Sequence, residues 1–268
     1  MTSAPVRWIS EQAIGEQIGF RLGRCDDGLV AEFVGIGTLS ARRDGHQSTF
    51  TPAHGADPIA VNKLQQSLLP ALLRHLTKKL TLHGSAVAWR GLAISCIGES
   101  GTGKSTTAAA LCTGFDGEFV ADDTSAVEFG DAHAELVPTE RMHWLVSGSI
   151  DPDPQGHIKR AVVPRASASK NPRLAAICRL LFDDAAPGAE LLRVRGQEAL
   201  AAVLPSVIRF VLDEPAMQEH EFEQLGRLAR TVPIYVLRRP RRAAEIQSSC
   251  QALVTLMHAL SKEAEEEP

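Results

Sequence analysis

The spacing of apolar and polar residues divides the chain into an alternating front part and a helical stretch that follows it. Within residues 17–60, the short runs LVAEFVGI and GTLSARRDGHQSTF are separated by turn-forming residues, a pattern typical of an antiparallel sheet. Between Ile59 and Lys79 apolar residues recur at helical spacing, and Pro70 predicts a kink or a break there. We therefore expect a β-rich N-terminal region plus a helix over residues 1–80.

The remaining residues, 81–268, mix strand-like and helical patterns without strict alternation. The runs RAVV, LAAICRLLF and VPIYVL have the composition of strands. The runs GQEALAAVLPSVI, EFEQLGRLAR and RAAEIQSSCQALVTLMHAL have helical spacing, and the last one is amphipathic. This arrangement predicts an α/β fold with a mixed sheet and flanking helices, rather than a plain doubly wound parallel sheet.

Two strand-like runs, TLHGSAVAW and LAISCIG, are separated by Arg90-Gly91, which is a plausible two-residue hairpin turn. A two-residue turn would pair Trp89 with Leu92, and the same register would bring His83 opposite Gly98. A histidine before a glycine is more often structural. Its register against the segment that begins at Gly98 makes it a candidate neighbour of a phosphate or a carboxylate.

That segment, GESGTGKS, matches the G-x-x-x-x-G-K-[ST] pattern of a phosphate-binding loop, with a strand-like run before it and a helix-forming run after it. Small residues allow backbone N–H groups to surround phosphate oxygens, and the following helix adds its positive end. Lys104 would contact the β- and γ-phosphates, and the Ser105 hydroxyl could bind Mg²⁺. The alternative is a glycine-rich turn that happens to end in Lys-Ser. The residues expected to bind the nucleotide are Gly98, Glu99, Ser100, Gly101, Thr102, Gly103, Lys104, Ser105 and Thr106.

Two adjacent carboxylates, Asp122 and Asp123, follow Lys104 closely in the sequence. The intervening residues suffice for one helix, the turn TGFDG and the short strand EFVA, which would return a carboxylate to the mouth of the loop. One acid could then hold Mg²⁺ while the other accepts a proton from an attacking hydroxyl. Both can serve one site only if the strand ends or twists there, because neighbouring side chains on a strand face opposite sides. The alternative is a solvated Asp-Asp turn.

Phosphoryl transfer also needs positive charge beyond Lys104. The segment KRAVVPRASASKNPR offers several basic residues, of which one or two would face the site; the candidates for a phosphate clamp are Lys159, Arg165 and Arg173. The cluster RRPRR, residues 238–242, is expected to be a solvated junction between a strand and a helix.

Composition and charge exclude several kinds of partner. The net charge of −4 and the pI of about 6.1 give no electrostatic case for nucleic acid or an anionic membrane. The N-terminal sequence lacks the apolar segment of a signal peptide, and the apolar runs are too short to span a bilayer.

Five cysteines show no CxxC spacing, and Cys96, Cys112 and Cys178 lie in apolar runs, so we expect buried thiols. These features fit a cytoplasmic protein, which could be an oligomer.

The segments LHGSAV, GESGTGKSTTAAAL and EFVADDTSAV together resemble the catalytic domain of HPr kinase/phosphorylase and, more widely, the phosphoenolpyruvate carboxykinase-like fold. The resemblance is strong over residues 82–127. It implies that the loop binds ATP and Mg²⁺, that Asp122 assists the metal and that Asp123 is the base toward the acceptor hydroxyl. It also implies that His83 lies near the phosphates. Compact relatives of this kind include kinases of lasso-peptide precursors.

The sequence departs from this family at two places. HPr kinases usually carry Glu where this chain has Thr106, and the EIRG signature that serves their substrate and phosphorylase function has no counterpart here. We therefore expect an ATP- and Mg²⁺-dependent kinase acting on a hydroxyl, for which a peptide or small protein is the preferred acceptor. The alternatives are a small-molecule kinase on the same scaffold and a nucleotide-binding regulatory protein without transfer activity. Residues 1–80 would recognise the substrate or merely extend the fold.

Overall fold

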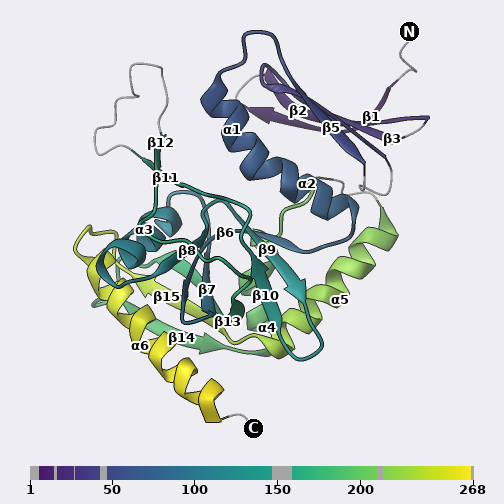
Figure 1. Ribbon diagram of the computed structural model, residues 1–268. Helices are drawn as coiled ribbons and strands as arrows, with labels where there is room; N and C mark the ends of the chain where they lie inside the picture. The colour runs from purple at the N-terminus through teal and green to yellow at the C-terminus, as the bar shows by residue number, and fades with distance from the viewer. Residues whose placement is uncertain are drawn as a thin grey trace. The chain divides into compact units, whose positions relative to one another are not determined.

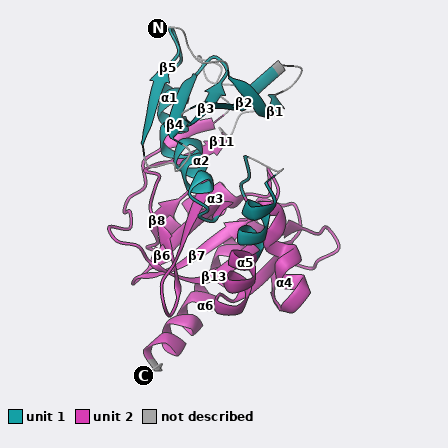
Figure 2. Ribbon diagram, turned by 90° about the vertical axis from the view of Figure 1, so that its right-hand side faces the viewer, with its two compact units in different colours: residues 1–80, 208–222 teal, residues 81–207, 223–268 magenta. Residues whose placement is uncertain are grey.

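The computed structural model describes residues 6–14, 17–26, 28–42, 47–146, 159–210 and 214–266. The chain forms two compact units (Figure 2). The first comprises residues 1–80 and 208–222, and the second comprises residues 81–207 and 223–268. The helix α5 (Pro215–Thr231) therefore contributes its first half to one unit and its second half to the other.

The first unit contains an antiparallel sheet whose strands are joined in chain order, as the alternation within residues 17–60 predicts. Its strands are β1 (Arg7–Ile14), β2 (Gln17–Cys25), β3 (Gly28–Phe33), β4 (Gly37–Arg42) and β5 (Ser48–Pro52). Leu22, Ala31 and Leu39 are buried on one face of this sheet, in a cluster that also contains Leu64 and Leu72 of the helices that follow. The strand β1 lies before the region in which the sequence indicated strands.

The helical stretch is broken, but not at Pro70 as predicted. Asp57 caps α1 (Pro58–Gln66) by accepting hydrogen bonds from the N–H groups of Ile59 and Ala60. The break falls at Ser67, and α2 (Leu68–Leu76) starts directly after it. Pro70 lies in the first turn of α2, where proline is tolerated because the N–H groups of that turn have no partner within the helix.

The described part of the second unit forms a mixed eight-stranded sheet in the order β10-β9-β6-β7-β13-β15-β14, with β8 also paired to β6 (Figure 1). The strands β7, β13 and β15 run parallel, and the other pairings are antiparallel. The bounds are β6 (Thr81–Trp89), β7 (Leu92–Ile97), β8 (Glu118–Ala121), β9 (Thr124–Phe129), β10 (Ala134–Val137), β13 (Arg173–Phe182), β14 (Glu190–Val194) and β15 (Ile234–Arg239). The prediction of an α/β fold with a mixed sheet is confirmed.

Helices flank this sheet. The helices α3 (Lys104–Gly114) and α6 (Glu245–Glu266) pack against each other and cover the face that carries Ile94 and Cys96 of β7. The helix α4 (Gly196–Val203) continues into a short 3-10 turn (Leu204–Ser206) and contacts β15. A separate two-stranded hairpin consists of β11 (His143–Val146) and β12 (Lys159–Val162). In the described chain no helix is both long and apolar enough to cross a membrane.

The predicted hairpin between β6 and β7 is confirmed. Trp89 pairs with Leu92, and Arg90 and Gly91 both have positive φ, as a tight type I′ turn requires. The ladder ends one pair before His83 would meet Gly98, and His83 pairs with Thr124 of β9 on the other edge of β6. The thiols of Cys96, Cys112 and Cys178 are buried, as the apolar runs indicated.

Candidate functional site

The segment GESGTGKS forms a loop between the end of β7 and the start of α3, at the carboxyl ends of the parallel strands. Gly98, Gly101 and Gly103 all have φ between 83° and 139°, a region that L side chains rarely adopt. A Cβ at Gly98 would lie 2.7 Å from the carbonyl oxygen of Leu180, so the backbone approaches its neighbour too closely for a side chain. The chain thus needs glycine at these positions to form the loop.

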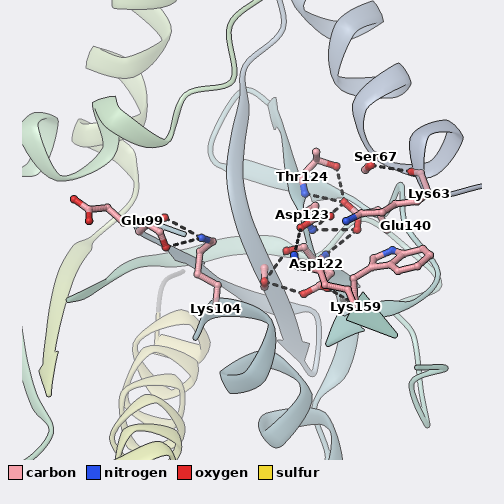
Figure 3. Close-up of polar contacts among 12 residues, drawn as sticks. Lys63, Ser67, Glu99, Lys104, Asp122, Asp123, Thr124, Glu140 and Lys159 are labelled. Carbon is pink, nitrogen blue, oxygen red and sulfur yellow. Dashed lines mark hydrogen bonds and ion pairs between the residues drawn. The ribbon is translucent and has the colours of Figure 1, made fainter. Parts of the chain in front are cut away.

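Lys104 closes the loop from the first position of α3. Its Nζ donates to the carbonyl oxygens of Gly98 and Glu99 at 2.9 and 3.0 Å (Figure 3). Burial, followed by the charge of Lys159, lowers the pKa of Lys104, while the charges of Asp123 and Asp122 raise it. No side chain caps α3 at Gly103, so the N–H groups of its first turn are available to phosphate oxygens.

Asp122 is fully buried in the bend between β8 and β9 and accepts hydrogen bonds from three sides. Its Oδ1 lies 3.0 Å from the Ser85 hydroxyl, and its Oδ2 lies 2.5 Å from the backbone nitrogen of Trp144. The Ser105 hydroxyl of the loop bonds to it as well. Burial raises the pKa of Asp122, and the hydrogen bond from Trp144 opposes this rise. The short path predicted from Lys104 through one helix and one strand back to the loop is therefore present.

Asp123 has a different environment, because the strand ends before both acids. Its side chain is 16% exposed, and its Oδ1 lies 3.6 Å from Nζ of Lys159 on β12. The bend thus directs one carboxylate to the loop hydroxyl and leaves the next one partly open to solvent beside a lysine.

Glu140 is a residue of this site that the sequence analysis missed. Its carboxylate accepts hydrogen bonds from the backbone N–H groups of Asp122, Asp123 and Thr124 and from the Thr124 hydroxyl (Figure 3). Burial is the main cause that raises the pKa of Glu140 to about 7, and the charges of Asp123 and Asp122 also raise it. The hydrogen bonds from Thr124 and Asp123 lower it. A single acid in a loop matches no motif, so only the folded geometry reveals it.

His83 is half-buried, and three charged groups of the site act on it. Burial lowers its pKa, and the charges of Lys104 and Lys159 lower it further. The charge of Asp123 and a hydrogen bond to the Asp123 backbone act in the opposite direction. The imidazole is therefore held neutral among these groups at pH 7, where it can exchange hydrogen bonds without adding a charge.

The basic residues considered for a phosphate clamp lie in different places. Lys159 lies beside Asp123. Arg165 donates to the carbonyl of Thr113 near the far end of α3, about 15 Å along the helix from the loop. Arg173 pairs with Leu92 at the opposite end of β7, also about 16 Å from the loop. The structure brings only Lys159 of the three to the acids.

The expectation that RRPRR is a solvated junction is wrong for its second arginine. Arg239 ends β15 with 3% exposure, whereas Arg238, Arg241 and Arg242 are exposed. Its Nη2 donates to the carbonyl oxygen of Thr102 in the phosphate loop at 2.9 Å. The alternation of the strand buries Arg239 at the end of the sheet where the loop lies.

The side chains of this site fit a nucleotide with Mg²⁺. The described residues contain no cluster of three His, Cys, Asp or Glu that would hold a metal ion alone. Mg²⁺ usually binds through one or two carboxylates, phosphate oxygens and water, and the hydroxyl of Ser105 and the carboxylate of Asp122 are hard oxygen donors of that kind. The three glycines of positive φ shape the loop before α3, whose first-turn N–H groups suit phosphate oxygens.

The fold that these elements define is a mixed α/β fold in which a glycine-rich loop joins a strand to a helix. No protein-family model matches the chain, and no curated protein matches its sequence. Among solved structures, the chain is similar to the HPr(Ser) kinase/phosphatase from Coxiella burnetii, with 12% identity and a TM-score of 0.38. The similarity covers 68% of this chain and 98% of that one. A similarity of this size says nothing about the chemistry of the site, which follows from the residues themselves.

Proposed function

We propose that this protein is an ATP- and Mg²⁺-dependent kinase that transfers the γ-phosphoryl group to a hydroxyl, preferably of serine, on a peptide or small protein. The observation that carries the proposal is the pairing of two adjacent acids in unlike environments. Asp122 is buried and bonded to Ser105 of the loop, and Asp123 is partly exposed beside Lys159. Phosphoryl transfer needs one acid at the metal and another at the attacking hydroxyl.

Each part of the site then has a role. Backbone N–H groups of residues 98–106 and the amine of Lys104 bind the phosphates. Ser105 and Asp122 hold Mg²⁺, which neutralises phosphate charge when bound. The buried hydrogen bonds from Ser85 and Trp144 keep the Asp122 carboxylate in one orientation.

Asp123 accepts the proton of the acceptor hydroxyl while the oxygen of that hydroxyl forms a bond to the γ-phosphorus. The bond from that phosphorus to the bridging oxygen breaks, and ADP leaves with the electron pair. Lys159, 3.6 Å from Asp123, adds positive charge where charge develops on the transferring group. His83, neutral among these groups, would exchange hydrogen bonds with the phosphates.

The acceptor class rests on the resemblance of LHGSAV, GESGTGKS and VADD to the HPr kinase pattern. Kinases of that type act on protein or peptide hydroxyls, and a ribosomal precursor peptide, such as a lasso precursor, is one acceptor of this class. The antiparallel sheet and helices of residues 1–80 would then serve substrate recognition. The protein would work in the cytoplasm.

The test is transfer of label from γ-³²P-ATP to serine-containing peptides and small proteins, with Mg²⁺ and with EDTA. Label on a peptide hydroxyl that requires Mg²⁺ supports the proposal. Stimulation of ATP turnover by a metabolite and by no peptide would mean a small-molecule kinase. Tight ATP binding with no turnover toward any acceptor would mean a nucleotide-dependent regulatory protein.

A further inference from the structure

Arg239 links the end of β15 to the floor of the phosphate loop. Its Nη2 donates to the carbonyl oxygen of Thr102 at 2.9 Å, and its Nη1 lies 3.2 Å from the hydroxyl of Ser249 on α6. That hydroxyl in turn donates to the carbonyl oxygen of Glu245 at 2.6 Å. The guanidinium also lies 5.5 Å from the ring centroid of Phe182. The phosphate loop, β13 and α6 thus all contact this one side chain.

The charge of Arg239 is buried without an ion-pair partner. The side chain is 3% exposed, and no carboxylate forms a salt bridge with it within the described ranges. Glu245 acts on it through charge at longer range only. Arginine stays protonated in proteins, and burying an unpaired charge is costly. Anionic phosphates in front of the loop would supply the missing counter-charge.

The loop is built around this cation. A Cβ at Gly103 would lie 2.6 Å from Nη2 of Arg239, so the backbone before Lys104 lies directly against the guanidinium. The Thr102 carbonyl oxygen points toward Arg239. The N–H of the same planar peptide group therefore points in the opposite direction, toward the phosphate side. The hydrogen bond therefore helps to orient the loop N–H groups toward an anion, and the charge adds to the positive potential of the loop.

We propose that Arg239 is a positioning residue for the nucleotide: a fixed cation beneath the phosphate loop that orients the loop and strengthens binding of the nucleotide phosphates. This inference rests on the proposed function only in that the loop binds ATP, and it does not depend on the acceptor.

The experiment is isothermal titration of ATP and ADP, and competition by adenosine, against the full-length wild type, Arg239→Gln, Arg239→Lys and Arg238→Gln. A unit charge near the phosphates in a partly buried site corresponds to roughly a ten- to hundredfold effect on affinity. Arg239→Gln should lose that much affinity for ATP and ADP while adenosine binding stays the same. Arg239→Lys, which keeps the charge, should lose less. Arg238→Gln is the matched control on the same strand, where the side chain is exposed, and it should behave as the wild type.

The thermal midpoint of each variant separates this role from a merely structural one. The inference is wrong if Arg239→Gln binds ATP as tightly as the wild type. It is also wrong if the variant loses affinity for ATP and for adenosine equally. If Arg239→Gln does not fold, Arg239→Lys decides: a loss of affinity for adenosine as large as its loss of affinity for ATP would overturn the inference. A wild type that binds no nucleotide would instead refute the proposed function, and the two failures are thereby distinguishable.

Discussion

The carboxylate of Glu140 and Thr124 are joined by two short hydrogen bonds: Oε1 lies 2.6 Å from the Thr124 hydroxyl and 2.7 Å from its backbone nitrogen. Because the same carboxylate also accepts from the N–H groups of Asp122 and Asp123, three successive amides converge on one side chain. This contact fixes the bend that separates the two acids, and it does so without touching the phosphate loop.

We expect Glu140→Gln to lower the kcat of phosphoryl transfer at least about tenfold with little change in KM for ATP. The amide nitrogen of glutamine would face backbone N–H donors, so the bend would relax and the acids would lose their placement. Steady-state kinetics with ATP varied at saturating acceptor would measure this. Glu135→Gln, on β10 and paired with His133, is the control. Unchanged kcat in Glu140→Gln would show that the bend needs no such anchor.

Lys104→Met should weaken ATP binding by at least about tenfold, because it removes the amine that lies across the loop at Gly98 and Glu99. The exposed Lys170, changed to Met, is the matched control. Equilibrium binding of a fluorescent ATP analogue and its displacement by ATP would report both. If Lys104→Met binds ATP with wild-type affinity, the loop is only a glycine-rich turn.

Much of this site could be predicted from local sequence. The loop, the helix that follows it and the strand before Asp122 are contiguous, so their spacing alone indicated that the acids return to the loop. The register of the hairpin at Arg90-Gly91 was likewise predictable because a two-residue turn fixes the pairing of the strands it joins.

Contacts between distant segments could not be predicted in this way. Glu140 reaches the bend from a loop, and Arg239 reaches Thr102 from a strand 137 residues away in sequence. A charge run such as RRPRR looks solvated in sequence, and only the pairing of β15 with β13 and β14 decides which arginine points inward. The position of the helix break at Ser67 instead of Pro70 has a local cause, since proline is acceptable in the first turn of a helix.

The stability of the protein should fall on acidification partly because of His143. This residue of β11 is 2% exposed, packs edge-on against Phe119, and neither of its ring nitrogens has a hydrogen-bond partner among the described residues. Burial lowers its pKa from 6.5 to about 4. The unfolded chain therefore binds a proton below pH 6.5 that the folded chain refuses. The contribution is fully present above pH 6.5 and is lost between pH 6.5 and 4, by up to about 1.4 kcal/mol per pH unit.

Urea unfolding of the wild type and His143→Leu at pH 7.5, 6, 5 and 4.5 would measure the contribution of His143 to the free energy of unfolding. The difference between their unfolding free energies should shift steadily in favour of the variant as pH falls, because other titrating groups cancel. A difference that does not vary with pH would contradict the assignment.

Thiol labelling should distinguish Cys25 from the other cysteines. Burial raises the pKa of Cys96 and of Cys112 to about 12, and that of Cys250 to about 11, and it also raises the pKa of Cys178. The thiolate is the reactive form, so these four should react slowly at pH 8. We expect one fast thiol per native chain, lost in Cys25→Ser, and five after denaturation. More than one fast thiol in the native protein would show that the sheet core opens readily.

The most direct test of the central claim is phosphoryl transfer by Asp123→Asn, with Asp131→Asn, at an exposed position, as the control. Transfer of label from γ-³²P-ATP to the peptide acceptor and ATP affinity should be measured on the same preparations. The account predicts that Asp123→Asn keeps wild-type ATP affinity and loses transfer by about a hundredfold or more, the scale of a general base. Wild-type transfer rates in Asp123→Asn would contradict it and leave the paired acids as a structural bend.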